Sequence, residues 1–193
     1  MSPATHFLFG WTIANTAKIE KRDRFLVTLA GVIPDADGLG IIVDYFAPRP
    51  AEPYFWYGEL HHLMGHNLTF GLAFVAITAC FAKRRFLTMM LAGISFHLHL
   101  FCDVLGSGAQ GGGRWPMPYL WPFSDAWVLD WTGQWALTAW PNIVITLVLL
   151  ILTGFLAWKR GFSPLEIFSR KADGGFVRAL RGRFGNPKTK HGS

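Results

Sequence analysis

Histidine and aspartate side chains recur inside apolar segments of this 193-residue chain. Titratable groups are costly in membrane-type segments, so each is a candidate for a functional role. The candidates include six of the seven histidines and come from separate stretches of the sequence: His6, Asp35, Asp37, His61, His62, His66, His97, His99 and Asp103. Imidazole nitrogens and carboxylate oxygens together are typical zinc ligands. The residue types therefore predict a mixed nitrogen and oxygen site for one or two Zn²⁺ ions.

Two pairs of candidates have the spacing of neighbours on one helix face. His99 and Asp103 are four residues apart, so on a helix both would face the same metal ion. His62 and His66 have the same spacing, although their segment need not be helical. His97 lies two residues from His99 and would point away from that ion. We therefore favour a hydrogen bond between helices for His97, with metal binding as the alternative.

The segment Pro34-Asp35-Ala36-Asp37-Gly38 is expected to break a helix, because proline removes a backbone donor and glycine tolerates unusual dihedral angles. Broken backbone at membrane depth is tolerated where it lines an enclosed or watery cavity. Asp35 and Asp37 are the catalytic candidates, with helix capping as the alternative for each. The predicted metal ligands are His6, Asp35, Asp37, His61, His66, His99 and Asp103. For His61, a hydrogen bond between helices remains an equal alternative.

The composition is that of a membrane protein. Hydrophobic residues make up 51% of the chain and charged residues 16%, against roughly 25% in typical soluble domains. The net charge of +6 comes from basic residues that are grouped rather than spread, which indicates membrane topology and not nucleic-acid binding. Cys80 and Cys102 lie in apolar runs, so we expect two buried thiols and no disulfide.

Five apolar segments must position these residues. Residues 140–158 carry no charged side chain and are close to the length needed to cross a bilayer. Weaker segments cover residues 3–17, 25–43, 68–82 and 86–105, and the second contains the break described above. The pattern predicts an all-α integral membrane bundle of about five helices with a broken second helix.

A single orientation places every basic cluster in the cytoplasm, as the positive-inside rule requires. It puts the N-terminus outside, the basic tail inside and all the candidate residues near the outer face of a bacterial-type inner membrane. We expect no removable signal peptide, a membrane-embedded metal-site domain over residues 1–158, and a cytoplasmic tail over residues 159–193. The tail is expected to be partly amphipathic and then disordered from residue 186.

Several motifs in order resemble the membrane-bound metal-dependent hydrolase family, whose members include LexA-regulated inner-membrane proteins. The motifs are Thr5-His6, Pro34-Asp35-Ala36-Asp37, the segment from His61 to His66, His99-Leu100-Phe101-Cys102-Asp103 and Pro122-Phe123-Ser124. The resemblance covers roughly residues 4–125 and extends distantly to zinc-dependent phospholipases C. It implies a zinc hydrolase that acts on phosphoesters or lipids.

One motif departs from the family pattern. The family commonly has His-Arg-Gly-x-Thr-His where this chain has His61-His62-Leu63-Met64-Gly65-His66, so only the outer histidines match. The missing arginine weakens the case for a phosphate grip at this position more than it weakens metal binding.

The sequence thus favours a membrane-embedded hydrolase that cleaves an ester or phosphoester of a lipid or lipid-linked substrate at the outer side. The alternative is a non-enzymatic membrane protein that transports or senses metal ions or protons, since His and Asp relays serve such roles too. A third alternative is a lipid-binding scaffold. The apolar inner halves of the segments favour the enzyme, because a transporter needs polar groups at several depths.

Overall fold

The computed structural model describes residues 1–46 and 56–187 of the chain. Residues 188–193, most of the segment expected to be disordered, lie outside the described residues. The chain is mainly helical. In order, the elements are α1 (Pro3–Ala14), α2 (Lys21–Ala30), the 3-10 helix η1 (Ile33–Leu39), α3 (Gly40–Phe46), α4 (Trp56–Leu60), α5 (Leu68–Phe81), α6 (Arg85–Gly106), β1 (Met117–Pro118), β2 (Val128–Leu129), α7 (Trp140–Arg160), the 3-10 helix η2 (Pro164–Ile167) and α8 (Arg170–Phe184).

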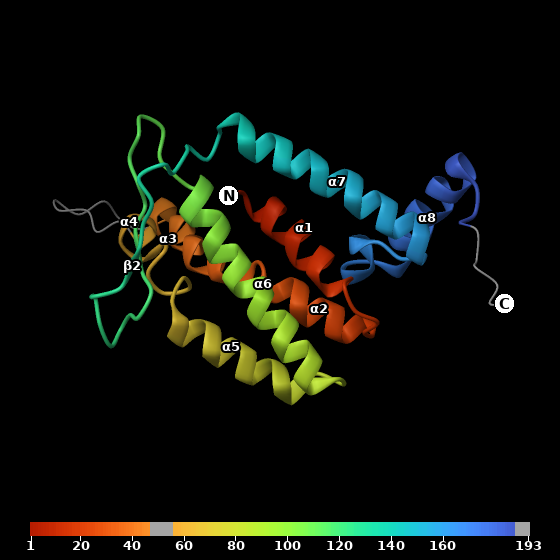
Figure 1. The fold of residues 1–193 in the computed structure, drawn as a ribbon, viewed down its shortest axis with the longest axis horizontal. Helices are drawn as coiled ribbons and strands as arrows, with labels where there is room; N and C mark the ends of the chain where they lie inside the picture. Colours follow the sequence, from red (N-terminus) through yellow and green to blue (C-terminus); the bar gives the residue numbers. More distant parts are fainter. Residues whose placement is uncertain (47–55, 188–193) are drawn as a thin grey trace.

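Helix α6 runs through the middle of the bundle and packs against α5, α2 and α1, while α7 packs along α1 (Figure 1). Trp11, Phe96 and Leu100 are almost fully buried between these helices. Strands β1 and β2 form a short antiparallel ribbon beyond the end of α6. Met117 of this ribbon packs on Phe96 and Leu100, so the ribbon closes one end of the core.

Two helices are long and apolar enough to cross a membrane, namely α6 and α7. A third span is formed if α2 and the segment from η1 to α3 count as one, with a bend of 54° between them. At 1.5 Å per residue, α1 covers about 18 Å and α5 about 21 Å, less than the ~30 Å of a hydrocarbon core. The five predicted helical segments are present, but five complete spans are not confirmed.

The break in the second segment is confirmed. Helix α2 ends at Ala30, and Pro34 lies in the first turn of η1, where its missing N–H costs no hydrogen bond. Cys102 is buried and free as expected, whereas the expectation for Cys80 was wrong: it is free but exposed. Helix α5 packs mainly against α6 and to a small extent against α2, so part of its surface, including Cys80, stays exposed.

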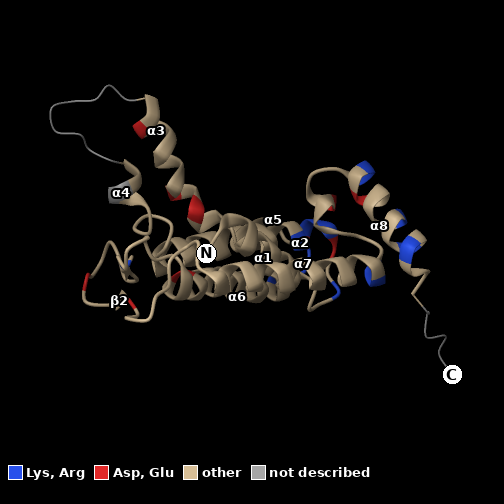
Figure 2. Cartoon of the chain, turned by 90° about the horizontal axis from the view of Figure 1, so that it is seen from above, with Lys and Arg blue, Asp and Glu red and all other residues tan. Residues whose placement is uncertain are grey.

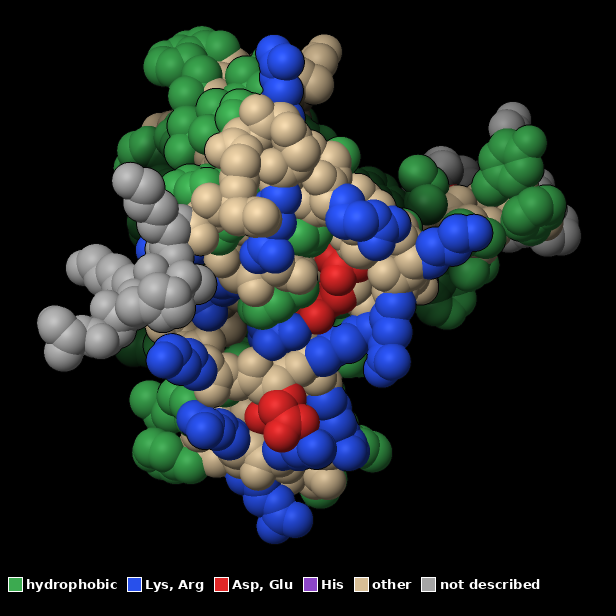
Figure 3. Space-filling view, turned by 90° about the vertical axis from the view of Figure 1, so that its right-hand side faces the viewer, with side chains coloured by type: hydrophobic (Ala, Val, Ile, Leu, Met, Phe, Trp, Pro, Cys, Tyr) green, Lys and Arg blue, Asp and Glu red, His purple; other side chains and the backbone are tan. Residues whose placement is uncertain are grey.

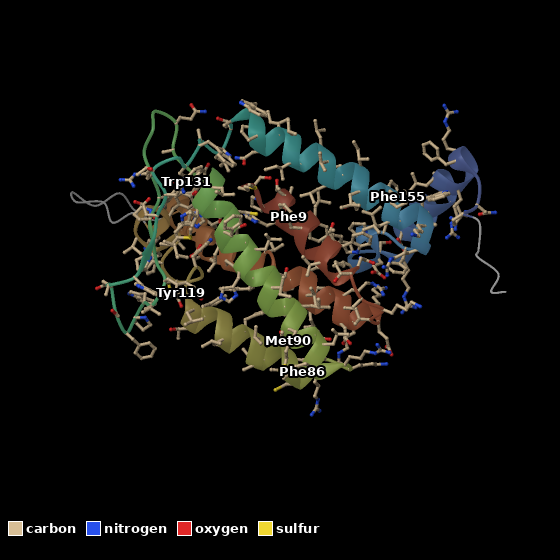
Figure 4. The ribbon with its side chains drawn as sticks, viewed as in Figure 1. Phe9, Phe86, Met90, Tyr119, Trp131 and Phe155 are labelled. Carbon is tan, nitrogen blue, oxygen red and sulfur yellow. The ribbon has the colours of Figure 1, made fainter. Side chains whose placement is uncertain are left out.

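Large apolar side chains cover the outside of the bundle. On α7, Ile143, Val148 and Ile151 are 57%, 57% and 74% exposed. Figure 4 shows Phe155 on α7 and Phe86 with Met90 on α6, at opposite edges of the bundle. Such continuous apolar surfaces suit a lipid environment. The exposed apolar surface of the fold therefore agrees with the membrane protein that the composition predicts.

Charged residues are divided between the two ends of the molecule. Most Lys and Arg residues lie at the end formed by α8, the start of α2 and the end of α7 (Figure 2), and Figure 3 views this end directly. Here the buried Arg24 and Glu166 form a bidentate pair at 2.7 Å, and Asp23 accepts hydrogen bonds from the backbone N–H groups of Lys83 and Arg84. These contacts tie η2 and the turn between α5 and α6 to helix α2.

The division of charge predicts which end faces outward. In a variant with Cys80 and Cys102 replaced by serine and alanine, we expect Ala109→Cys to react with an impermeant maleimide added to intact cells. Ala179→Cys on α8 serves as the matched control and is expected to react only after the membrane is opened. Both positions are exposed in the fold. Labelling of Ala179→Cys in intact cells would contradict this orientation, because it would place α8 outside the cell.

Candidate metal centre

All seven predicted metal ligands, together with His62, meet at the end of the bundle opposite the basic one. His6 comes from the start of α1, and His99 and Asp103 from the last turns of α6. Asp35 and Asp37 come from η1, while the histidines before α5 lie in turns that follow α4. In Figure 1 this is the region where the end of α6, the N-terminus and the η1–α3 segment approach one another.

Two glycines allow the segments to approach so closely. A Cβ atom on Gly65 would lie 2.2 Å from the carbonyl oxygen of Pro34, so the histidine segment contacts the aspartate segment backbone to backbone. A Cβ atom on Gly10 would lie 2.8 Å from the carbonyl oxygen of Thr28, where α1 crosses α2. Larger residues at either position would separate the elements that carry the candidate ligands.

Asp103 lies at the centre of the cluster. Its Oδ1 is 3.1 Å from Nε2 of His6 and also contacts the amino group of Met1. Its Oδ2 is 3.0 Å from Nε2 of His99, 3.5 Å from Nε2 of His66 and 3.9 Å from Nε2 of His62. Oδ1 therefore faces one imidazole and the terminal amino group, whereas Oδ2 faces three imidazoles, so Asp103 lies within reach of histidines from both ligand groups that include it.

Neighbouring acceptors fix the ring orientation of two histidines. Nδ1 of His99 donates to the backbone carbonyl of Gly31 at 2.9 Å, and Nδ1 of His66 donates to Oδ2 of Asp37 at 3.0 Å. A neutral imidazole with a proton on Nδ1 presents a lone pair at Nε2. The Nε2 atoms of His66 and His99 then face each other across 3.1 Å. Oxygen or nitrogen partners of this kind usually orient histidines that bind metals.

The donor set fits a bound cation. The Nε2 atoms of His66 and His99 and the buried Oδ2 of Asp103 repel one another unless positive charge, in the form of a proton or a metal ion, lies between them. Ligand atoms fall within 4.8 Å of one another in three overlapping groups: His6, Asp35, His99 and Asp103; His62, His66 and Asp103; and Asp37, His61 and His66. The first two groups share only Asp103, which suits two ions.

The two catalytic candidates differ in their surroundings. Asp37 accepts hydrogen bonds from His61 at 2.7 Å, from His66 and from the backbone N–H of Gly65 at 2.9 Å, so both its oxygens are engaged. Oδ1 of Asp35 lies 3.7 Å from Nε2 of His99, and its Oδ2 has no hydrogen-bond partner. Asp37 is thus arranged to hold histidines, whereas Asp35 keeps an oxygen available.

Burial and charge act together on the histidines before α5. Burial disfavours the charged form of His66, but hydrogen bonds to Asp103 and Asp37 outweigh it and raise its pKa to about 9. Burial and the neighbouring His66 lower the pKa of His62 to about 2. The carboxylates thus concentrate positive charge at His66, while His62 stays neutral and keeps a lone pair available for coordination.

The backbone around His62 is unusual. Its φ of +67° lies in the left-handed region that non-glycine residues seldom adopt. Residues 61–65 form turns, so the spacing of His62 and His66 does not reflect a shared helix face. The sequence pattern does not decide whether His62 binds metal. This turn brings the centroid of its ring to 4.4 Å from that of the His66 ring. Strain of this kind often occurs at functional sites.

The structure adds aromatic residues that no sequence signal identified. The Trp115 ring lies 4.7 Å from that of His62 and 5.1 Å from that of His61, and Tyr57 stacks on His61 at 4.7 Å. These rings cover the cluster on the side of the ribbon that contains β1. Their contacts depend on the path of the loops after α4 and α6, which no local periodicity encodes.

His97 lies apart from the three groups. Its Nε2 is 2.9 Å from the hydroxyl of Tyr119, and its Nδ1 is 2.8 Å from the carbonyl of Gly93. Its hydrogen-bonding partners are thus its own helix and a residue after β1, so the expected hydrogen bond between helices is not seen among the described residues.

Comparison with known proteins gives one family. The profile of a family described as the YdjM inner membrane protein matches residues 1–175, which is most of the chain and includes every candidate ligand. No curated protein and no solved structure matches the chain.

Proposed function

Because the chain belongs to the YdjM inner membrane protein family, its histidine and aspartate cluster lies in an inner-membrane protein, and we propose that it is the active site of a metal-dependent hydrolase. The family membership confirms the inner-membrane part of the resemblance seen in the sequence. The hydrolase part is our proposal. The observation that carries it is the convergence of the Nε2 atoms of His66 and His99 on Oδ2 of Asp103.

The residues that would hold zinc are Asp103 with His6 and His99 on one side, and Asp103 with His62 and His66 on the other, which leaves the nearby Asp35 unligated. Zinc, when bound, lowers the pKa of a bound water towards neutrality and polarises the ester or phosphoester oxygen. Gly31 and Asp37 keep the Nε2 atoms of His99 and His66 directed at the centre. This arrangement is rigid because its supports lie on helices and on a backbone carbonyl.

We assign the general base to Asp35. Its side chain is 14% exposed, against 0% to 3% for His6, His62, His66, His99 and Asp103, so it lies at the accessible edge of the cluster. Its Oδ2 is buried and has no hydrogen-bond partner among the described residues, so it can accept a proton from an attacking water held inside the cluster. The water oxygen forms the new bond to carbon or phosphorus, the bond to the leaving oxygen breaks, and that oxygen takes up a proton.

A lipid-like substrate suits the surroundings of the cluster. The loop between α6 and α7 exposes Phe123, Trp127 and Trp131 at 83%, 64% and 42% at the same end of the bundle. Figure 4 shows Trp131 and Tyr119 in this region. Aromatic side chains of this kind lie at headgroup depth in membranes. The cluster would then meet esters and phosphoesters at the outer surface.

The transport alternative needs ionisable groups at several depths. Between Arg85 and His97, the described part of α6 carries only hydroxyl and apolar side chains, and α7 has no charged residue before Lys159. The ionisable groups of α6 are Arg85 at its start and those in its second half, from His97 onward, and those of α7 are its last two residues. This distribution favours a site of chemistry at one face over a path across the membrane.

The proposal is tested by hydrolysis assays on full-length protein in detergent. We expect turnover of bis(4-nitrophenyl) phosphate or 4-nitrophenyl butyrate, at least tenfold slower after treatment with a zinc chelator and restored by added Zn²⁺. Zinc alone in the same detergent is the control. Turnover that is unchanged by complete zinc removal would contradict the proposal.

A further inference from the structure

A cationic cavity lies at the basic end of the molecule, far from the metal centre. It encloses about 400 Å³ between the start of α2, the turn before α6 and the start of α8. Its lining consists of Glu20, Lys21, Arg22, Phe25, Lys83, Ile167 and Arg170. Figure 3 shows the Lys and Arg side chains that gather on this face.

The cavity has unneutralised positive charge. Nζ of Lys83 pairs with Glu20 at 2.7 Å, and both are exposed. In the part of the chain that the structure describes, Lys21, Arg22 and Arg170 have no carboxylate within 4.0 Å. Three cations therefore face one opening, and like charges held together in this way attract an anion.

An apolar recess adjoins the cationic cavity. It encloses about 200 Å³, and its lining is Phe7, Phe25, Thr28, Leu29, Val32, Ile167 and Phe168. Phe25 and Ile167 line both spaces, so the recess continues from the cavity along α2 towards the middle of the bundle. Phe168 is 75% exposed at its rim.

We propose that these two spaces form one binding site for an anionic phospholipid. The headgroup phosphate lies among Lys21, Arg22 and Arg170, and an acyl chain lies in the recess between Phe25 and Ile167. Basic pockets on the cytoplasmic side of membrane helices suit anionic headgroups. A soluble anion would leave the recess without a partner, and a purely apolar ligand would leave the cations without one.

Two further observations fit this site. The buried Arg24–Glu166 pair, with Arg24 also 3.8 Å from the Phe162 ring, fixes the segment around Ile167 against α2, so the site is formed before lipid arrives. The larger apolar groove between α7 and α8, lined by Leu150, Phe155, Leu180 and neighbouring residues, has no cation in its lining. Charge thus distinguishes the proposed site from other apolar surfaces. The inference does not depend on the hydrolase activity.

The test is lipid titration of the detergent-purified full-length protein, followed by native mass spectrometry. Phosphatidylglycerol and phosphatidylcholine with identical chains are compared. We expect phosphatidylglycerol to bind more tightly, and the Lys21→Gln, Arg170→Gln variant to bind it about 30-fold more weakly, since each cation contributes about fivefold. Arg178→Gln, Arg183→Gln removes the same charge from exposed positions of α8 outside the site, and we expect less than about a threefold change.

A third measurement distinguishes binding of a lipid from binding of a free anion. Inorganic phosphate at the same concentration is expected to leave bound phosphatidylglycerol in place, because the recess holds the acyl chain. Displacement by phosphate alone would show an anion site without a lipid. Equal binding of phosphatidylcholine, or an equal loss in the two charge variants, would likewise overturn the proposal. The four substituted residues are exposed or half-buried at the surface, so the two variants can be compared as folded proteins.

Discussion

Full-length protein purified in detergent is expected to retain zinc, and the His99→Ala, Asp103→Ala variant is expected to lose nearly all of it. Asp103 contributes to both groups that could hold an ion, and His99 is the imidazole closest to it. Removing both takes a charge and a nitrogen ligand from the same centre. We expect zinc affinity to fall by at least about 100-fold, beyond the 10–100-fold typical of changes to residues that only support ligands. Metal content is measured after passage over a chelating resin.

Two controls distinguish loss of ligands from loss of fold. His97→Ala removes an imidazole from the same helix whose contacts are Tyr119 and Gly93, so its zinc content is expected to match that of the parent. Asp103→Asn keeps the shape of the side chain and removes only its charge, and it is expected to lose zinc as the double variant does. Equal zinc content in the parent and the double variant would show that His99 and Asp103 are not zinc ligands.

The largest expected effect on turnover comes from Asp35→Asn. An amide cannot accept the proton that a carboxylate takes, so we expect kcat for the nitrophenyl substrates to fall by about 10²- to 10⁴-fold. His6, His99 and Asp103 remain at the centre, so bound zinc is expected to stay near the parental level. Paired measurement of kcat and zinc content checks this. Zinc loss in proportion to activity would show that Asp35 acts as a ligand rather than as the base.

Asp37→Asn makes a matched comparison with Asp35→Asn. Asp37 contacts His61, His66 and the backbone of Gly65, so its replacement should loosen His66 and lower zinc affinity by about 10–100-fold. We expect most of the activity to return when zinc is added in excess, unlike that of Asp35→Asn. Asp44→Asn is the control, because among the described residues Asp44 accepts hydrogen bonds from the backbone N–H groups of Trp56 and Tyr57 and from none of the candidate ligands. Failure of excess zinc to restore Asp37→Asn would place Asp37 in the chemistry itself.

The helical segments could be predicted from the sequence with good accuracy. The apolar stretch 140–158 corresponds to α7 at Trp140–Arg160, and 86–105 to α6 at Arg85–Gly106. Long uncharged runs leave few alternatives to a helix, because every backbone group must be satisfied within the segment. The number of spans was less predictable, since α1 and α5 are apolar but short, and apolar character alone does not show which helices cross completely.

The candidate site was predictable in composition but not in detail. His99 and Asp103 could be paired from their spacing, because helix geometry fixes which residues share a face. The place of His62 was not predictable, because its ring direction depends on a turn with a positive φ. The separate environments of Asp35 and Asp37, two residues apart in one short 3-10 helix, also depend on which neighbours each carboxylate meets.

The sequence by itself determined that this is a helical membrane protein with titratable residues in its apolar segments, because hydropathy and residue spacing are local properties. Only the tertiary structure decided that His6, Asp35, His66, His99 and Asp103 meet at one centre. Their meeting depends on close backbone contacts at Gly10 and Gly65 and on acceptors such as the Gly31 carbonyl. These contacts join residues far apart in the chain. They form only when the whole bundle packs, so no single segment could form them alone.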